Sequence, residues 1–143
     1  MAAGFELLEH GADYGVRGTG NTFEQAFEEC AKAMFSILKD LKNIRAKETV
    51  EVEVQAVSKE ELLVKWLNEL LYKSHVDSFL FKEFKIGLLE QQGKQWVLKG
   101  KAFGEKVDFS KELIAIEVKG ATFTGLKVGK EGEKFIAQCV VDV

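Results

Sequence analysis

TFEQAFEECAKAMFSIL, residues 22–38, predicts a helix with one apolar face. Its apolar side chains recur at steps of three and four residues, which is the period of a single helix face. They are Phe23, Ala26, Phe27, Cys30, Ala33, Met34, Ile37 and Leu38. Thr22 and Gln25 have the spacing of a capping box, so the helix is expected to begin at this threonine. A continuous apolar face of this kind packs on a flat apolar surface, which a β-sheet provides.

The segments around this helix predict a mixed fold. Residues 58–75 repeat the pattern of a capping box followed by an apolar helical stripe, and in residues 50–55 valine alternates with polar side chains as in a half-buried strand. Further strands are expected at residues 5–8, 16–19, 79–89, 95–103, 114–118, 125–130 and 134–143. We therefore expect an α+β fold in which two helices pack on an antiparallel-rich β-sheet, as a single domain over residues 1–143.

Composition narrows the classes of function. The chain has 143 residues, of which 46% are apolar and 30% charged, so it can bury a core. The net charge is −3 and no Lys/Arg run occurs, which argues against direct nucleic-acid binding and favours a protein partner with a basic surface. Cys30 and Cys139 lie in apolar patterns and are expected to be buried, inert thiols. With no signal-like segment and no apolar stretch of membrane length, we expect a cytoplasmic protein without a membrane partner.

Two aspartates are the first candidates for chemistry. Asp13 follows a glycine where a strand turns, so its carboxylate either bonds a backbone N–H of the turn or binds a ligand. Asp142 ends an apolar strand beside Val143, whose α-carboxylate would add a second acid. Such a pair is an oxygen-rich site suited to Ca²⁺ or Mg²⁺, and the alternative is a frayed, solvated end.

Glu117 and Lys119 form a further candidate pair, because alternation over residues 114–118 would place them on one face of a strand. The alternative is a solvated ion pair of little energetic value. No Ser/His/Asp or Cys/His constellation and no phosphate-binding glycine loop is readable in the chain. The sequence therefore does not predict an enzyme.

Several segments together resemble the archease family. Residues 9–15, Glu-His-Gly-Ala-Asp-Tyr-Gly, resemble its opening motif Asp-His-Thr-Ala-Asp-Ile-Gly. Residues 22–27 are similar to its T-x-E-E-A-F helix start, and residues 63–72 to a helix containing W-L-N-E-L-L-Y. Residues 117–122 resemble E-V-K-A-x-T, and residues 140–143 resemble a V-x-D-V ending. The likeness runs in order along almost the whole chain.

The resemblance implies a function in RNA ligation. Archeases are accessory proteins of the RtcB-type RNA ligase of tRNA splicing, promote its guanylylation and multiple turnover, and broaden its nucleotide use; tRNA is met only through the ligase. The resemblance also implies a divalent metal, Ca²⁺ with Mg²⁺ or Mn²⁺ as alternatives, whose ligands correspond to Asp13, Asp142 and Val143. Lys119, beside Glu117, corresponds to a lysine implicated in ligase activation. The implied fold is a strand–helix–strand–strand module with an inserted helix and strands.

These motifs differ from the family pattern at three places. Glu9 replaces Asp, Gly11 replaces Thr, and Phe123-Thr124 stands where Tyr-His is frequent. These differences change the first acidic residue of the opening motif and the position of that histidine, whereas Asp13, Asp142 and Lys119 match the family pattern. Two other functions stay open from the residues alone: a stand-alone metal-dependent enzyme using the same carboxylates, and a generic protein-interaction module.

Overall fold

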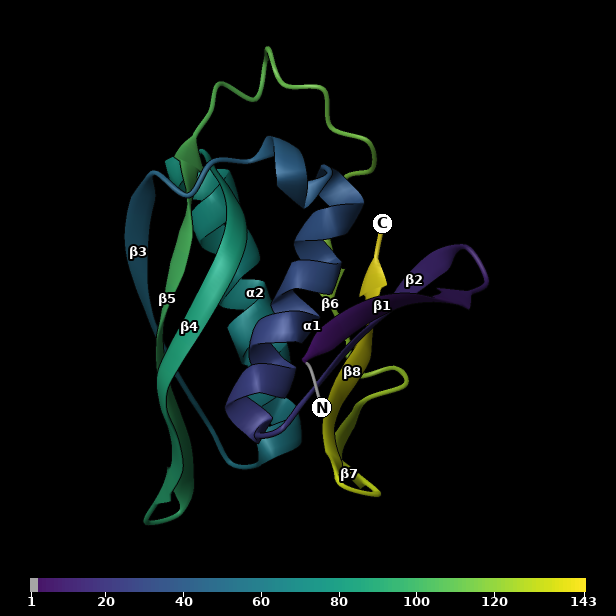
Figure 1. Cartoon of the computed structure of the whole chain (residues 1–143), viewed down its shortest axis with the longest axis vertical. Helices are drawn as coiled ribbons and strands as arrows, with labels where there is room; N and C mark the ends of the chain where they lie inside the picture. Colours follow the sequence, from purple (N-terminus) through teal and green to yellow (C-terminus); the bar gives the residue numbers. More distant parts are fainter. Residues whose placement is uncertain (1–2) are drawn as a thin grey trace.

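The computed structural model describes residues 3–143, in which two α-helices lie between two antiparallel sheets (Figure 1). In chain order the elements are β1 (Gly4–His10), β2 (Asp13–Gly20), α1 (Phe23–Leu38), the 3-10 helix η1 (Leu41–Asn43), β3 (Glu48–Ala56), α2 (Lys59–Asp77), β4 (Phe79–Gln92), β5 (Gln95–Lys106), β6 (Gly120–Ala121), β7 (Lys127–Glu131) and β8 (Lys134–Asp142). No helix in this described part of the chain is long and apolar enough to cross a membrane.

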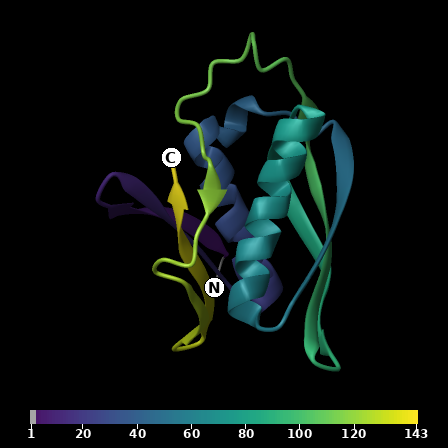
Figure 2. The ribbon, with the colours of Figure 1, turned by 180° about the vertical axis from the view of Figure 1, so that it is seen from behind.

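The strands divide into two sheets. One has five strands, in the order β1-β2-β8-β6 with β7 also pairing β8, and the other has three, in the order β3-β5-β4. Seen from behind, α2 lies beside the three-stranded sheet and β6 lies beside β8 (Figure 2). The expected α+β class with antiparallel sheets is confirmed. Along the chain, β3, α2, β4 and β5 come after α1 and before β6, β7 and β8. This inserted stretch supplies the three-stranded sheet and the helix beside it.

Helix α1 begins where the capping box predicts. The Gln25 N–H donates to the Thr22 hydroxyl at 3.1 Å, and the Asn21 N–H donates to the Gln25 side-chain oxygen at 2.8 Å. The helix then lies very close to β2, because Gly18 has no side chain: a Cβ there would be 2.1 Å from the Ala26 carbonyl oxygen. The missing side chain at Gly18 therefore allows α1 to pack directly on the five-stranded sheet.

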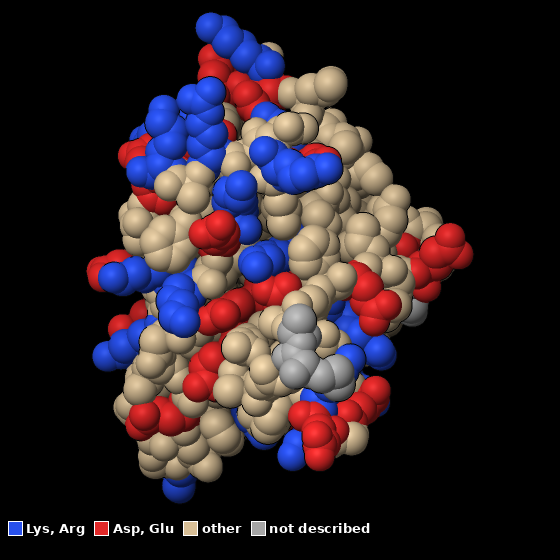
Figure 3. Space-filling view, in the orientation of Figure 1, with Lys and Arg blue, Asp and Glu red and all other residues tan. Residues whose placement is uncertain are grey.

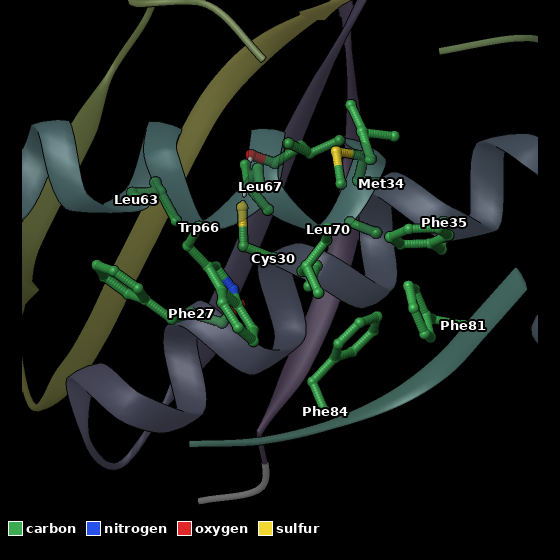
Figure 4. Close-up of a cluster of buried hydrophobic side chains, with 14 of the residues drawn as sticks. Phe27, Cys30, Met34, Phe35, Leu63, Trp66, Leu67, Leu70, Phe81 and Phe84 are labelled. Carbon is green, nitrogen blue, oxygen red and sulfur yellow. Dashed lines mark hydrogen bonds between the residues drawn. The ribbon is translucent and has the colours of Figure 1, made fainter. Parts of the chain in front are cut away.

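The core fills the space between the two sheets (Figure 4). The Trp66 side chain is fully buried, and its indole N–H donates to the Phe27 carbonyl oxygen at 3.1 Å, which ties α2 to α1. Phe35 of α1 meets Phe81 of β4 edge-on, with ring centroids 5.5 Å apart. Edge-to-face packing and a satisfied indole are the usual requirements for burying such large aromatic groups.

The predicted strand at residues 114–118 is wrong, because this segment is irregular. Its alternation is real: Val118 is fully buried, Ile114 and Ile116 pack on the core, and the intervening residues are exposed. The segment has only isolated backbone bonds, such as the one from the Ala115 N–H to the Leu38 carbonyl at 2.8 Å, and lacks a neighbouring strand over its length. An extended segment can therefore alternate buried and exposed side chains without the backbone hydrogen bonds to a neighbouring strand that define a β-strand.

Candidate functional site

The hairpin of β1 and β2 positions Asp13. Its turn is two residues, Gly11-Ala12, closed by the pairing of His10 with Asp13. Gly11 has φ +60°, a conformation that suits glycine and that a β-branched threonine would resist. Asp13 is therefore the first residue of β2 and lies at the projecting end of the five-stranded sheet.

The last strand brings Asp142 and Val143 to the same place. Tyr14 of β2 pairs with Val141 of β8, and the next step of this register sets Asp13 beside Asp142. The Val143 N–H donates to the Asp13 carboxylate at 3.3 Å. Residues 13 and 143 thus meet in space. Asp13 does bond a backbone N–H, but that N–H belongs to Val143 and not to the turn, and ligand binding by Asp13 stays a prediction.

The side chains of the two aspartates face away from the helices. Val141 is fully buried on the helix side of β8, so the alternation of the strand turns Asp142 outward, where it is exposed. Asp13 is half-buried on the same outward face, because residues opposite each other on neighbouring strands share a face. In the view of Figure 3, acidic side chains lie at the projecting end of the hairpin, while basic and acidic side chains are mixed over the three-stranded sheet.

Strand β6 adds Lys119 to the edge of this site. Gly120 pairs with Asp142, and the Lys119 N–H donates to the Asp142 carbonyl oxygen at 2.8 Å. Lys119 and Glu117 are both exposed, and within residues 3–143 neither forms a salt bridge. The expected strand is wrong here, since β6 starts only at Gly120, but Glu117 and Lys119 are exposed on either side of the buried Val118 and so share a face of the extended chain. The backbone of the lysine lies next to Asp142.

The residues that depart from the family motifs lie around this edge. Glu9 is exposed on β1, where it pairs with Tyr14. Phe123 is 64% exposed, and the Thr124 carbonyl accepts the Val140 N–H at 3.0 Å, so this segment continues alongside β8. Only the main chain of Thr124 takes part in this bond.

The donor set fits a hard divalent cation. The carboxylates of Asp13 and Asp142 and the main-chain oxygen of Val143 are all oxygen ligands, which Ca²⁺, Mg²⁺ and Mn²⁺ prefer. Across the described residues there is no group of three or more His, Cys, Asp or Glu side chains that could hold a metal. A cation at this edge would therefore be held by two side chains, main-chain oxygen and water.

The two cysteines are not available as nucleophiles or metal ligands. Burial raises the pKa of the Cys139 thiol to about 12, and burial raises that of Cys30 well above its ordinary value. Both are buried free thiols, and the Cys30 Sγ contacts the Val16 carbonyl oxygen at 3.7 Å. Thiols in such surroundings stay protonated and make poor nucleophiles or metal ligands.

A hollow of about 530 Å³ lies elsewhere, on the solvent face of the three-stranded sheet. It is lined by Glu51, Val52, Glu53, Lys85, Gly87, Leu88, Lys99, Gly100 and Lys101. Its charges are partly matched within the sheet: Lys99 is 3.9 Å from Glu53, whereas Lys101 lies opposite Glu51 on one side and Lys85 on the other. It is the solvated face of a sheet.

The comparisons with known proteins show the family of this chain. Residues 5–143 match the model of the Archease protein family (MTH1598/TM1083). The chain belongs to the archease family. It is 37% identical over 140 residues to the protein archease of Pyrococcus furiosus, covering 97% of this chain and 98% of that one, and 34% identical over 139 residues to the protein archease of Methanosarcina barkeri, covering 97% and 95%.

A solved structure has the same fold as this archease. The solution structure of Methanobacterium thermoautotrophicum protein 1598 superposes with a TM-score of 0.85, at 31% identity, and covers 98% of this chain and 99% of its own. The family and fold expected from the motifs are therefore confirmed, while the metal and the ligase partner are matters of proposal.

Sequence reasoning missed one residue that supports the edge of the candidate site. Asn68 of α2 reaches β6, where its side-chain oxygen accepts the Ala121 N–H at 2.8 Å and its NH₂ group donates to the Ala121 carbonyl at 3.1 Å. The signal was present, because Asn68 is a polar residue directly after buried Leu67 and two before buried Leu70. Its partner, 53 residues away, could not be read from the sequence.

Proposed function

We propose that this archease is an accessory protein of an RtcB-type RNA ligase of tRNA splicing and is not itself an enzyme. In this role it promotes guanylylation of the ligase, sustains multiple turnover and broadens nucleotide use. Asp13, Asp142 and Val143 bind a divalent cation, preferentially Ca²⁺, and Lys119 with its neighbour Glu117 contacts the ligase or its nucleotide. RNA is handled by the ligase.

One observation carries the proposal. The Val143 N–H bonds the Asp13 carboxylate at 3.3 Å, which draws two acids from opposite ends of the sequence to one exposed edge. Surface carboxylates repel one another at neutral pH, so an arrangement that keeps two of them adjacent is favoured when a cation binds there. Family membership supports the same assignment, since the matched region includes both acids.

The chemistry of guanylylation suits such an edge. The step places the phosphates of GTP next to the ligase nucleophile, and a divalent cation, when bound, neutralises phosphate oxygens in that setting. The exposed position of Asp142 leaves the site open to a partner, and the Lys119 ammonium, which is free of salt bridges within the described residues, is available to an acidic or phosphate group.

The test is RNA ligation by a purified RtcB-type ligase under two regimes. With ligase in excess over RNA, each ligase acts once and this protein should have little effect. With RNA in excess, the protein should raise the yield well beyond one product per ligase, together with the fraction of guanylylated ligase. Equal multiple-turnover yields with and without the protein would overturn the proposal.

Two further measurements separate the other functions. Turnover of RNA or nucleotide by this protein alone, abolished by a chelator, would indicate a stand-alone metal-dependent enzyme. Binding to the ligase that is unchanged in chelator and in an Asp142→Ala variant would indicate an interaction module in which the carboxylates are ordinary surface charge.

A further inference from the structure

Asn68 bonds strand β6 as a peptide group of a neighbouring strand would. Its side-chain oxygen accepts a hydrogen bond from the Ala121 N–H at 2.8 Å, and its NH₂ group donates one to the Ala121 carbonyl oxygen at 3.1 Å. One edge of β6 pairs with β8, and the helix side chain takes bonds on the other. A paired exchange of this kind fixes the position of the strand in two directions at once.

Strand β6 requires such support because it is only two residues long. It follows an irregular segment, and its backbone bonds to β8 begin with the Lys119 N–H on the Asp142 carbonyl at 2.8 Å. So short a strand forms few ladder bonds and is expected to fray on its own.

The helix that carries Asn68 is well suited to hold another segment in place. Its neighbours Trp66, Leu67 and Leu70 are fully buried, and the Trp66 indole bond to Phe27 fixes this turn of α2 against α1. A polar group on a rigid element positions its partner more accurately than one on a loop does.

We infer that Asn68 is a positioning residue, which holds the main chain of Lys119 and Gly120 against Asp142 and thereby aligns the lysine with the carboxylates. The inference rests on the proposed function for the role of that alignment. The structural part, that Asn68 secures β6 on β8, stands on the contacts alone.

The experiment compares Asn68→Ala with Asn43→Ala in the full chain. Asn43 is an exposed asparagine of η1, so it controls for loss of an asparagine side chain. Hydrogen–deuterium exchange should show the Lys119 and Ala121 amides exchanging at least about 10-fold faster in Asn68→Ala, as expected for the loss of two hydrogen bonds, while buried amides of α1 keep their protection. Unchanged protection at Lys119 and Ala121 would overturn the inference.

A second variant covers the case in which Asn68→Ala folds poorly. Asn68→Asp keeps an acceptor for the Ala121 N–H but sets a carboxylate against the Ala121 carbonyl. Protection of Ala121 should therefore be low at neutral pH and recover as pH falls through about 4, where a protonated Asp can donate again. General destabilisation would lose protection further on acidification, and that outcome would overturn the inference.

Ligase stimulation gives the functional readout. Asn68→Ala should lose most of the stimulation of multiple-turnover ligation, and Asn43→Ala should retain it. Full stimulation by Asn68→Ala, in spite of faster exchange at Lys119, would overturn the positioning role. If the unaltered protein fails to stimulate the ligase, the proposed function fails, whereas the exchange comparison still decides whether Asn68 secures β6.

Discussion

Replacing each aspartate of the site by alanine should separate folding from function. The Asp142 side chain is exposed and, within the described residues, has no hydrogen bond or salt bridge; the bond from the Lys119 N–H goes to its main-chain oxygen and survives the substitution. We expect Asp142→Ala to change the free energy of unfolding by less than about 0.5 kcal/mol, as at an ordinary surface position. The melting temperature should then move by less than about 2 °C.

Asp13→Ala should cost more stability for the same loss of charge. It removes the acceptor of the Val143 N–H, a bond of 3.3 Å at a half-buried position. A single hydrogen bond of this kind is worth about 1 kcal/mol, or about 2–4 °C in melting temperature for a chain of this size. Loss of that bond also frees the end of β8, so the Asp142 carboxylate would lose its alignment.

Both variants should fail functionally. Calcium titration by calorimetry should show affinity reduced by about two orders of magnitude, since ligand charge sets the strength of such sites, and stimulation of multiple-turnover ligation should be lost. Glu133→Ala is the matched control, because Glu133 is an exposed carboxylate in the turn at the opposite end of β8. Full calcium affinity and full stimulation by Asp142→Ala would refute the assignment of the site, and a collapse in its melting temperature would refute the description of that side chain as unpartnered.

Three further predictions concern the fold and its ionisable groups. Gly18→Ala should destabilise by about 3 kcal/mol or more in chemical denaturation, because the new Cβ would be 2.1 Å from the Ala26 carbonyl and α1 would have to move off β2; a stable variant would contradict that contact. Burial raises the pKa of Glu28, so the stability associated with its protonated form is present below about pH 4.5 and is lost as the pH rises through the higher pKa of the folded state. Glu28→Gln should therefore be more stable than the parent protein at neutral pH and lose this advantage in acid. Thermal melts recorded across a range of pH would measure the difference. Cys30 and Cys139 should resist a thiol reagent at about pH 8 and react together only in denaturant, and equal labelling rates with and without denaturant would show that they are accessible.

Local pattern predicted the elements of this fold well where each residue's environment depends on near neighbours. The helix that begins at Thr22 and the hairpin between β4 and β5 follow from capping and turn chemistry that operates within four residues. The same reasoning failed at residues 114–118, because alternation reports which side chains are buried and says nothing about whether another strand lies alongside.

The sequence by itself determined the two helices, most of the strands, the family and the residue types available for a cation site. Only the tertiary structure decided that the strands form two sheets, that Asp13 meets Val143 across 130 residues, and that Asn68 secures β6. The physical reason is that periodicity and capping act within a few residues, whereas pairing between distant strands is selected by the packing of the whole core. The carboxylate site belongs to the second kind, since each acid alone is an ordinary surface residue and only the register of β2 on β8 brings them together.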